Sequence, residues 1–362
     1  MATSEGTWAY RDAFGDEFAR TYFRRFGEGV VSSIGAGTYL GDPTDAADDA
    51  YHEALVDALE SGINVLDTAI NYRHQRSERV VGRAIEDADV DREAVVVATK
   101  GGFVPFDGER PADPGRWVHE HYVEPGLVAA AELVAGQHCI APEYIDDQLD
   151  RSLSNLGLDT VDCYYVHNPE TQLTDRPREA VYDRLEATFT RLEERAAAGD
   201  LAQYGVATWD AFRVPADHEK YLSLSEIVSR ARAAAEAAGT AATHFRAVQL
   251  PFNVAMADAF TVASQAGPEG PQSVLWFAQE AGLDVFASAS LAQGRLAEGL
   301  PPAVAEQVGG ETSAQRAINF ARSAPGVTCA LVGMGSPAHV AENVAAGTYP
   351  PLGADAFDAV FE

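Results

Sequence analysis

The chain has 362 residues, enough for one large α/β domain or two average domains, and 46% of its residues are hydrophobic, as in an ordinary globular protein with a core. Its 55 acidic side chains outnumber its 26 basic ones and give a formal net charge of −29. A surface with this charge repels nucleic acid and anionic membranes, so these partners are excluded from our expectations.

The acidic residues occur singly along the chain, as in DPTDAADDAYHEALVDALE (42–60), which indicates a whole-surface bias typical of adaptation to high salt. Cys139, Cys163 and Cys329 form no CxxC pair, and we expect Cys163 and Cys329 to be buried small residues, with no metal site. The first residues contain no apolar signal core, and no run approaches the ~18 apolar residues that span a bilayer. We therefore expect a soluble, cytoplasmic protein.

Eight short apolar runs are predicted to be buried parallel strands, because such strands read as continuous β-branched and aromatic runs. Helical patterns lie between them, and several end at a glycine, which favours helix termination. The first helix, 45–62, carries an apolar face made of Ala54, Leu55, Ala58 and Leu59. The predicted strands are residues 32–37, 63–66, 94–98, 161–166, 203–207, 246–250, 284–288 and 327–332.

Eight strand–helix units predict an α/β fold of the closed (β/α)₈ TIM barrel type, with residues 1–362 as a single domain. Residues 1–28 form an N-terminal extension that we expect to close the barrel floor. Long loops are expected after strands 3 and 6, at 101–140 (an inserted loop) and 251–271, and connections beyond ~12–15 residues are usually lids or binding loops. An open doubly wound sheet is the competing fold, and the lack of GxGxxG after the first strand counts against it.

Reactive side chains follow three successive predicted strands, where a barrel would bring them to one mouth. Asp67 and Tyr72 follow the second strand, Lys100 the third and His167 the fourth. Singly, each has an ordinary explanation as a helix cap, a solvated lysine or a satisfied polar group. Together they have a chemical logic: carbonyl reduction needs a proton donor, and tyrosine, with a pKa near 10, is a weak acid. Lys100 would lower the pKa of Tyr72, Asp67 would hold Lys100, and His167 would orient the carbonyl oxygen.

These residues resemble the aldo-keto reductase superfamily, which carries an Asp–Tyr–Lys–His tetrad on a (β/α)₈ barrel and uses a nicotinamide cofactor. GINVLDTAINYRHQRSERVVGRAI (62–85) is similar to the family's GxxxxDTAxxY…SExxxG motif, and VATKGG (97–102) and YYVHNPE (164–170) complete the tetrad. The resemblance implies an NAD(P)-dependent oxidoreductase that reduces an aldehyde or ketone, or oxidises an alcohol or sugar. The catalytic residues that it implies are Asp67, Tyr72, Lys100 and His167.

Later segments resemble the family's cofactor contacts in the same order, from GAGTYLG (35–41) to LVGMGSPAHVAENVAA (331–346). Where relatives usually direct Lys or Arg toward the 2′-phosphate of NADP, this chain has Gly333, Ser336 and His339, so both NADP(H) and NAD(H) remain open. The cofactor-binding residues implied are Gly37, Thr38, Tyr39, Thr208, Gln249, Ser288, Leu291, Gln293, Gly294, Gly333, Gly335, Ser336, His339, Glu342 and Asn343.

The substrate, a small-molecule carbonyl or alcohol, is expected in an apolar pocket over the nicotinamide. Two other classes stay open: a cofactor-binding regulatory or partner-binding subunit without turnover, and a barrel lyase or isomerase with a Schiff base at Lys100. The intact tetrad argues against the first, and the Asp67–Tyr72 motif against the second. The chain is expected to be a monomer or a small homo-oligomer. The pocket residues expected are Tyr39, Phe103, Trp117, His119 and Trp209.

Overall fold

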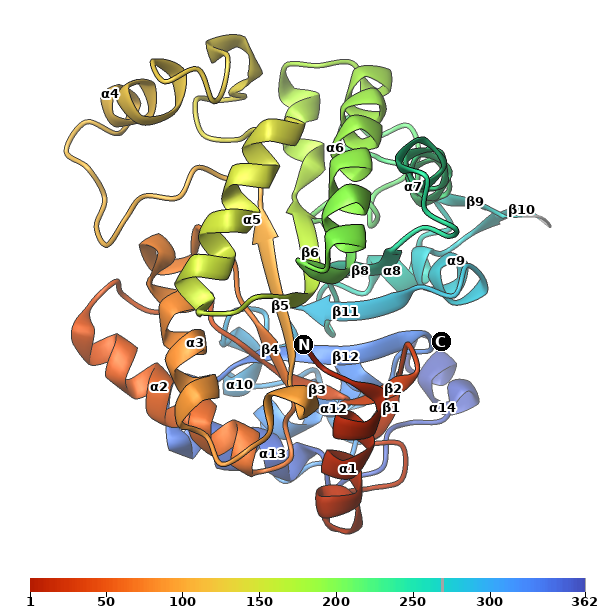
Figure 1. Cartoon of the computed structure of the whole chain (residues 1–362). Helices are drawn as coiled ribbons and strands as arrows, with labels where there is room; N and C mark the ends of the chain where they lie inside the picture. The colour runs from red at the N-terminus through yellow and green to blue at the C-terminus, as the bar shows by residue number, and fades with distance from the viewer. Residues whose placement is uncertain (268–269, 362) are drawn as a thin grey trace.

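The computed structural model describes residues 1–267 and 270–361, and at its centre these residues form a closed barrel of eight parallel strands (Figure 1). The strands pair in chain order, and β12 returns to β3 to close the ring. The predicted (β/α)₈ barrel is thus confirmed, and each predicted run overlaps one strand of the barrel. The strands are β3 (Ile34–Gly37), β4 (Val65–Asp67), β5 (Val96–Gly101), β6 (Val161–His167), β7 (Leu201–Ala207), β8 (Phe245–Pro251), β11 (Asp284–Ser288) and β12 (Val327–Gly333).

The main helices lie outside the barrel, one after each strand (Figure 1). In α5 and α6 the chain leaves the helix at Gly157 and Gly199, whose φ angles of 64° and 93° suit glycine. The helices are α2 (Asp45–Glu60), α3 (Arg76–Asp87), α5 (Pro142–Leu156), α6 (Arg178–Ala198), α7 (Leu224–Ala238), α9 (Val274–Glu280), α12 (Ser313–Ser323) and α13 (Pro337–Ala346).

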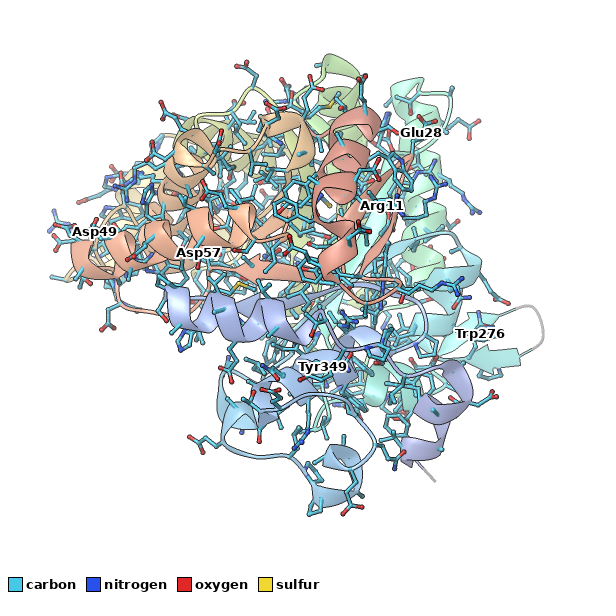
Figure 2. The ribbon with its side chains drawn as sticks, turned by 90° about the horizontal axis from the view of Figure 1, so that it is seen from below. Arg11, Glu28, Asp49, Asp57, Trp276 and Tyr349 are labelled. Carbon is cyan, nitrogen blue, oxygen red and sulfur yellow. The ribbon has the colours of Figure 1, made fainter. Side chains whose placement is uncertain are left out.

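Helix α2 shows how the sequence pattern sets the orientation of these helices. The Thr44 side chain caps its first turn by accepting from the amide of Ala47. The predicted apolar face, from Ala54 to Leu59, is buried against the barrel, whereas Asp49 and Asp57 lie on the outer side (Figure 2). Apart from Asp48, which is buried and pairs with Arg73, the acidic residues of this helix therefore face away from the core, and the surface carries the charge.

The residues before β3 cover the N-terminal end of the barrel. They form α1 (Ser4–Phe14) and a hairpin of β1 (Phe23–Phe26) and β2 (Gly29–Ser32). Phe26 meets Phe286 of β11 edge to face, with ring centroids 5.9 Å apart, and Val31 lies in the same buried cluster as Cys163 and Cys329. The hairpin thus lies at the end of the barrel that the N-terminal extension was expected to close. The assignment of the chain to a single domain stays a prediction.

The two predicted long loops are present. The loop after β5 contains α4 (Pro114–Val118) and stands out from the barrel beside α5 (Figure 1). The loop after β8 contains α8 (Asp258–Thr261), β9 (Gln265–Gly267) and β10 (Gly270–Gln272).

The remaining short helices are α10 (Arg295–Glu298), α11 (Pro302–Ala305) and α14 (Ala354–Asp358). None of the helices in the described ranges combines the length and the hydrophobicity that a bilayer crossing needs.

Candidate active site

A buried lysine–carboxylate pair lies at the C-terminal end of the barrel. Asp67 is the last residue of β4, and Lys100 lies near the end of the neighbouring β5. The ammonium of Lys100 donates to Asp67 Oδ2 and to the carbonyl oxygen of Thr68, each at 2.7 Å. Asp67 Oδ1 accepts from Gln249 Nε2 at 2.7 Å, so both carboxylate oxygens are hydrogen-bonded. Lys100 is 0% exposed, and these partners are what make a buried ammonium tolerable.

Tyr72 lies beside this pair. After β4 the amide of Ile70 donates to the carbonyl of Lys100 at 3.2 Å, and the chain turns so that the Tyr72 ring centroid lies 4.9 Å from Lys100 Nζ. Burial raises the pKa of Tyr72, Lys100 lowers it, and Asp67 raises it, with a net upward shift. The sequence led us to expect a lowered pKa, but burial outweighs Lys100. Tyr72 therefore carries its proton at neutral pH.

The ammonium of Lys100 is held in its charged form. Burial lowers the pKa of Lys100, but Asp67 and Tyr72 raise it by more, so the pKa lies above its ordinary value. Lys100 is also one of only two lysines among the 26 Lys and Arg residues of the chain. A compact ammonium suits two oxygens at one point better than the wide, planar fork of an arginine.

His167 ends β6 on the same side of the barrel. Its ring centroid lies 5.9 Å from that of Tyr72, and Asn168, with φ 47°, turns the chain directly after it. Burial lowers the pKa of His167 well below its usual range, and Lys100 and His138 lower it further, so the imidazole is neutral. Its Nδ1 is buried and has no hydrogen-bond partner in the described part of the chain. A ligand that completes this hydrogen bond would be favoured.

A second buried histidine holds the end of β6. His138 comes from the loop after β5, and its Nε2 donates to the carbonyl oxygen of His167 at 2.7 Å. Its Nδ1 accepts from Gln172 Nε2 at 2.8 Å, in the short helix Pro169–Thr174. Burial lowers the pKa of His138 to about 4, against a smaller raising effect of the bond to His167, so this ring is also neutral. Phe103 contacts both rings, at centroid distances of 4.7 and 5.1 Å.

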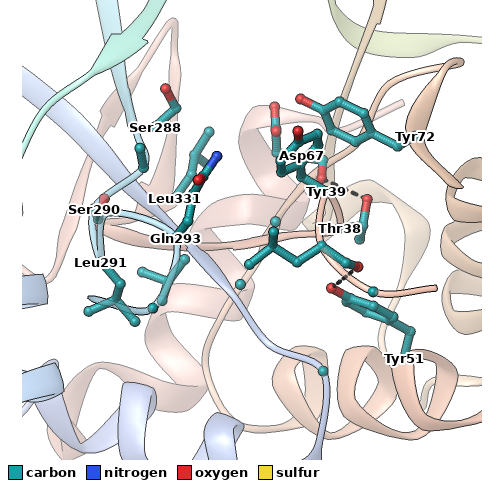
Figure 3. A pocket seen from close by; sticks show the side chains of 18 of the residues that line it. Thr38, Tyr39, Tyr51, Asp67, Tyr72, Ser288, Ser290, Leu291, Gln293 and Leu331 are labelled. Atoms are coloured by element: carbon teal, nitrogen blue, oxygen red, sulfur yellow. Dashed lines mark hydrogen bonds between the residues drawn. The ribbon is translucent and has the colours of Figure 1, made fainter. Parts of the chain in front are cut away.

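These groups lie at one end of a cavity of about 840 Å³ at the C-terminal mouth. Seven of the eight strands contribute residues to it, and β5 is represented only by Phe103, two residues after its end. Figure 3 shows Tyr39, Asp67 and Tyr72 on one side, and Ser288, Ser290 and Leu291 on the other. The residues expected from the sequence that line this cavity are Gly37, Thr38, Tyr39, Asp67, Tyr72, Phe103, His167, Thr208, Trp209, Gln249, Ser288, Leu291, Gln293, Gly294, Gly333, Gly335, His339, Glu342 and Asn343.

Lys100 and Ser336 do not line the cavity. Lys100 lies behind the wall, where it acts on the cavity only through Tyr72 and Asp67. Ser336 was expected to bind cofactor, but its side chain caps α13 by accepting from the amide of His339 at 3.4 Å. The helix start therefore uses the hydroxyl that the sequence assigned to a ligand.

Trp117 and His119, which were expected in the substrate pocket, also lie outside this cavity. Trp117 stacks on His121 at a centroid distance of 4.2 Å and meets Phe106 edge to face at 5.3 Å. His119 is exposed and pairs with Glu124 at 3.4 Å. The inserted loop packs its aromatic residues against itself and the barrel, and only Phe103, at its beginning, reaches the cavity.

Sequence reasoning missed three residues of this region. Asn71 and Asn168 line the cavity, and each directly adjoins a residue of the expected tetrad, a signal that the sequence contained. His138 had no such signal, because nothing in the sequence distinguishes it from His119 in the same long loop.

The polar atoms of the cavity fit a nicotinamide cofactor. Thr208 Oγ1 and Asn343 Nδ2 are buried in its wall without a partner among the described residues, and a ligand rich in amide and hydroxyl groups would satisfy both. Ala289, Ala292 and Gln293 have left-handed φ angles of 53°, 48° and 58°. Such residues cost about 1–3 kcal/mol each and cluster at ligand sites, and backbone amides in such turns can cradle a pyrophosphate.

A (β/α)₈ barrel with reactive groups at the C-terminal mouth is the arrangement of TIM-barrel enzymes. The model of the Aldo/keto reductase family matches residues 33–362, so the chain belongs to that family. This confirms the resemblance found in the sequence.

Known proteins show the same relationship. The NADH-specific methylglyoxal reductase of Escherichia coli (strain K12) is 29% identical over 204 residues, which are 55% of this chain and 53% of that protein. The match thus spans about half the length of this curated relative. An aldo-keto reductase from Bacillus halodurans in its holo form shares the fold with a TM-score of 0.63 and 20% identity, covering 94% of this chain and 96% of that one. For an aldo-keto reductase from Klebsiella pneumoniae in complex with NADPH, the TM-score is 0.61 and the identity 21%, with 94% of both chains covered.

Proposed function

We propose that this protein is an NAD(P)-dependent oxidoreductase that reduces an aldehyde or ketone, or oxidises the corresponding alcohol or sugar. The observation that carries the proposal is the position of Tyr72. Lys100 Nζ lies 4.9 Å from the centroid of its ring, and the centroid of the His167 ring lies 5.9 Å from it. Membership of the family and the fit of the cavity to a nicotinamide cofactor support it.

In this proposal Tyr72 is the proton donor in the reductive direction and the acceptor in the oxidative one. The bound nicotinamide supplies or receives the hydride at the carbonyl carbon. Tyr72 gives its phenolic proton to the carbonyl oxygen, and the nearby Lys100 ammonium stabilises the tyrosinate that remains. Because burial disfavours that tyrosinate, the charge of Lys100 is needed most at this step.

Asp67 and His167 act through position and polarity. Asp67 fixes the Lys100 ammonium at 2.7 Å, so the cation remains under Tyr72 instead of turning to solvent. His167 is neutral, so a ring N–H can donate to the carbonyl oxygen without adding a second cation beside Lys100. The two groups together would polarise and orient the carbonyl.

The cofactor would be held along the whole cavity. Thr208 and Gln249 suit its carboxamide, the turn at Gln293 its pyrophosphate, and Glu342 and Asn343 its adenosine end. Since no Lys or Arg of the described residues lines the cavity, the 2′-phosphate of NADP(H) would gain no firm cation there. We therefore propose that NAD(H) and NADP(H) are used with little discrimination.

The alternatives fit the site less well. A Schiff base at Lys100 would need a neutral, reachable amine, but this amine is fully buried, donates to two oxygens and has a raised pKa. A regulatory or partner-binding subunit would not need the full set of Tyr72, Lys100, Asp67 and His167 around a cavity of this size.

The proposal also covers the location of the protein, its oligomeric state and its adaptation to salt. We place the protein in the cytoplasm, as a monomer or a small homo-oligomer, with a surface adapted to high salt. The acidic outer faces, as on α2, are the support for the salt adaptation (Figure 2).

The proposed function is tested by nicotinamide absorbance. Purified protein would be incubated with NADH or NADPH and a panel of aldehydes and ketones, and with NAD⁺ or NADP⁺ and the matching alcohols and sugars. Substrate-dependent oxidation or reduction of the cofactor is the expected result. Cofactor binding without turnover of any panel member would contradict the proposal and favour the regulatory subunit.

A further inference from the structure

The cavity wall next to the reacting groups is aromatic and, among the described residues, carries no cationic side chain. The Tyr39 ring lies 5.0 Å from that of Tyr72, between centroids, and the Phe103 ring 5.1 Å from that of His167 (Figure 3 for the tyrosines). Trp209, just after β7, lines the same cavity and is 40% exposed at its mouth. A substrate at Tyr72 would therefore touch aromatic faces.

The charged groups of the cavity offer nothing to an anion. Among the described residues, the titratable side chains that line it, apart from tyrosines, are Asp67, His167, His339 and Glu342. Two of these four are carboxyl groups, and the burial of His167 keeps its imidazole neutral. The cation nearest to the reacting groups, Lys100, is already paired with Asp67 and hidden behind the wall.

Two arginines beside the part of the mouth near Tyr72 and Trp209 are already paired. Arg73, whose side chain adjoins Gly41 of the cavity wall, makes a buried ion pair with Asp48. Arg213 donates from Nε to the carbonyl oxygen of Trp209 at 2.8 Å, and its guanidinium pairs with Asp258 at 3.2 Å. Neither arginine lines the cavity.

From this distribution we infer that the substrate of the proposed reaction is an uncharged carbonyl compound or alcohol, and that compounds bearing a carboxylate or phosphate near the reacting carbon are rejected. A carboxylate on this wall would lose water and gain no cation, which is unfavourable. The formal charge of −29 would also repel it on approach, although salt screens that long-range effect. The inference rests on the proposed function and names its substrate class.

The test compares pairs of aldehydes that share a carbon skeleton and differ in charge. One pair is p-formylbenzamide and p-formylbenzoate, and the other is glyceraldehyde and glyceraldehyde phosphate. In molar salt, where long-range repulsion is screened, kcat/KM should favour the uncharged member of each pair by at least ~30-fold. Equal or higher kcat/KM for the anions would overturn the substrate class alone. Absence of turnover with every compound would overturn the proposed function and this inference with it.

Substitutions of two exposed tryptophans distinguish the effect of a cation in the cavity wall from the effect of the same charge added elsewhere on the chain. Trp209→Arg adds a cation to the wall, whereas Trp276→Arg adds the same charge on α9, where the side chain is 54% exposed and outside the cavity (Figure 2). Trp209→Gln controls for the loss of the indole. Trp209→Arg should raise the ratio of kcat/KM for anion over neutral aldehyde by about tenfold, since a desolvated carboxylate gains an ionic hydrogen bond. Trp209→Gln and Trp276→Arg should change it by less than about twofold. An equal change in Trp209→Arg and Trp276→Arg would overturn the inference.

Discussion

His138 and His167 are joined by a hydrogen bond of 2.7 Å from the Nε2 of the first to the carbonyl oxygen of the second. The bond fastens the long loop after β5 to the strand end that carries the proposed substrate-orienting imidazole. Gly102 lies between them, and a β-carbon there would come within 2.8 Å of the His167 carbonyl oxygen and 3.1 Å of His138 Nε2. The Gly102 backbone is thus packed against the His167 carbonyl and the His138 ring as closely as a glycine allows.

We predict that His138→Leu lowers kcat/KM for carbonyl reduction by about tenfold or more. The His167 carbonyl loses its side-chain donor, the Gln172 amide loses one of its two acceptors on His138, and His167 shifts. His138→Gln keeps a side-chain donor and should recover part of the loss. Nicotinamide affinity should stay the same, which distinguishes positioning from unfolding. The control is His121→Leu, an exposed histidine in the same loop. Wild-type kcat/KM in His138→Leu would contradict this role.

For Lys100, the prediction concerns pH. Lys100→Met should remove most turnover, and the alkaline limb of any residual reductive rate should move to higher pH. The sign follows from the charges: the ammonium lowers the pKa of Tyr72 against the raising effect of burial, so its removal lets the pKa rise further. Asp67→Asn should reduce turnover less. Lys220→Met, which changes the only other lysine of the chain, is the control. An unchanged rate and pH profile in Lys100→Met would show that the ammonium does not act on Tyr72.

The fold was largely predictable because buried parallel strands have a strong sequence signal. The boundaries were less so: the run expected at 94–98 is a strand at Val96–Gly101, since Lys100 and Gly101 continue the ladder by pairing with Tyr165 and Val166 of β6. The apolar signal ended at Ala98, before the polar Thr99 and Lys100, but the hydrogen-bond ladder continued to Gly101.

The candidate site was predictable where strand ends define it and not where loops do. Asp67 and His167 end their strands, so barrel geometry alone brings them to one mouth. Trp117 and His119 lie in a long loop whose side-chain directions depend on tertiary packing, and the same packing, invisible in the sequence, places His138 behind His167.

Salt should stabilise the fold. With 55 acidic and 26 basic residues, repulsion between carboxylates on outer faces such as that of α2 opposes folding in dilute buffer, and molar salt shortens its range to about 3 Å. We expect the thermal midpoint to rise steadily across a potassium chloride series. Chloride is preferable to sulfate, which strengthens apolar burial in any protein. A midpoint that stays flat or falls would contradict salt adaptation.

Cofactor choice should be weak. Without a Lys or Arg among the described lining residues, kcat/KM for NADPH and NADH should agree within about tenfold, or ~1.4 kcal/mol. His339→Arg would place a cation in the cavity wall and should shift both kcat/KM and the dissociation constants toward NADPH. Ser336→Arg, outside the cavity, should shift them less and lose the cap of α13, at about 1 kcal/mol of stability. A wild-type preference for NADPH beyond about a hundredfold would mean that another residue holds the phosphate.

The most direct test of the proposed chemistry is turnover by Tyr72→Phe, measured together with its affinity for NADH and NADPH. The substitution removes one hydroxyl and leaves the ring beside Lys100 and His167 in place. If Tyr72 is the proton donor, kcat should fall by at least ~100-fold while cofactor dissociation constants stay within about twofold of wild type. A variant that binds cofactor normally and keeps near-wild-type kcat would contradict the assignment of Tyr72.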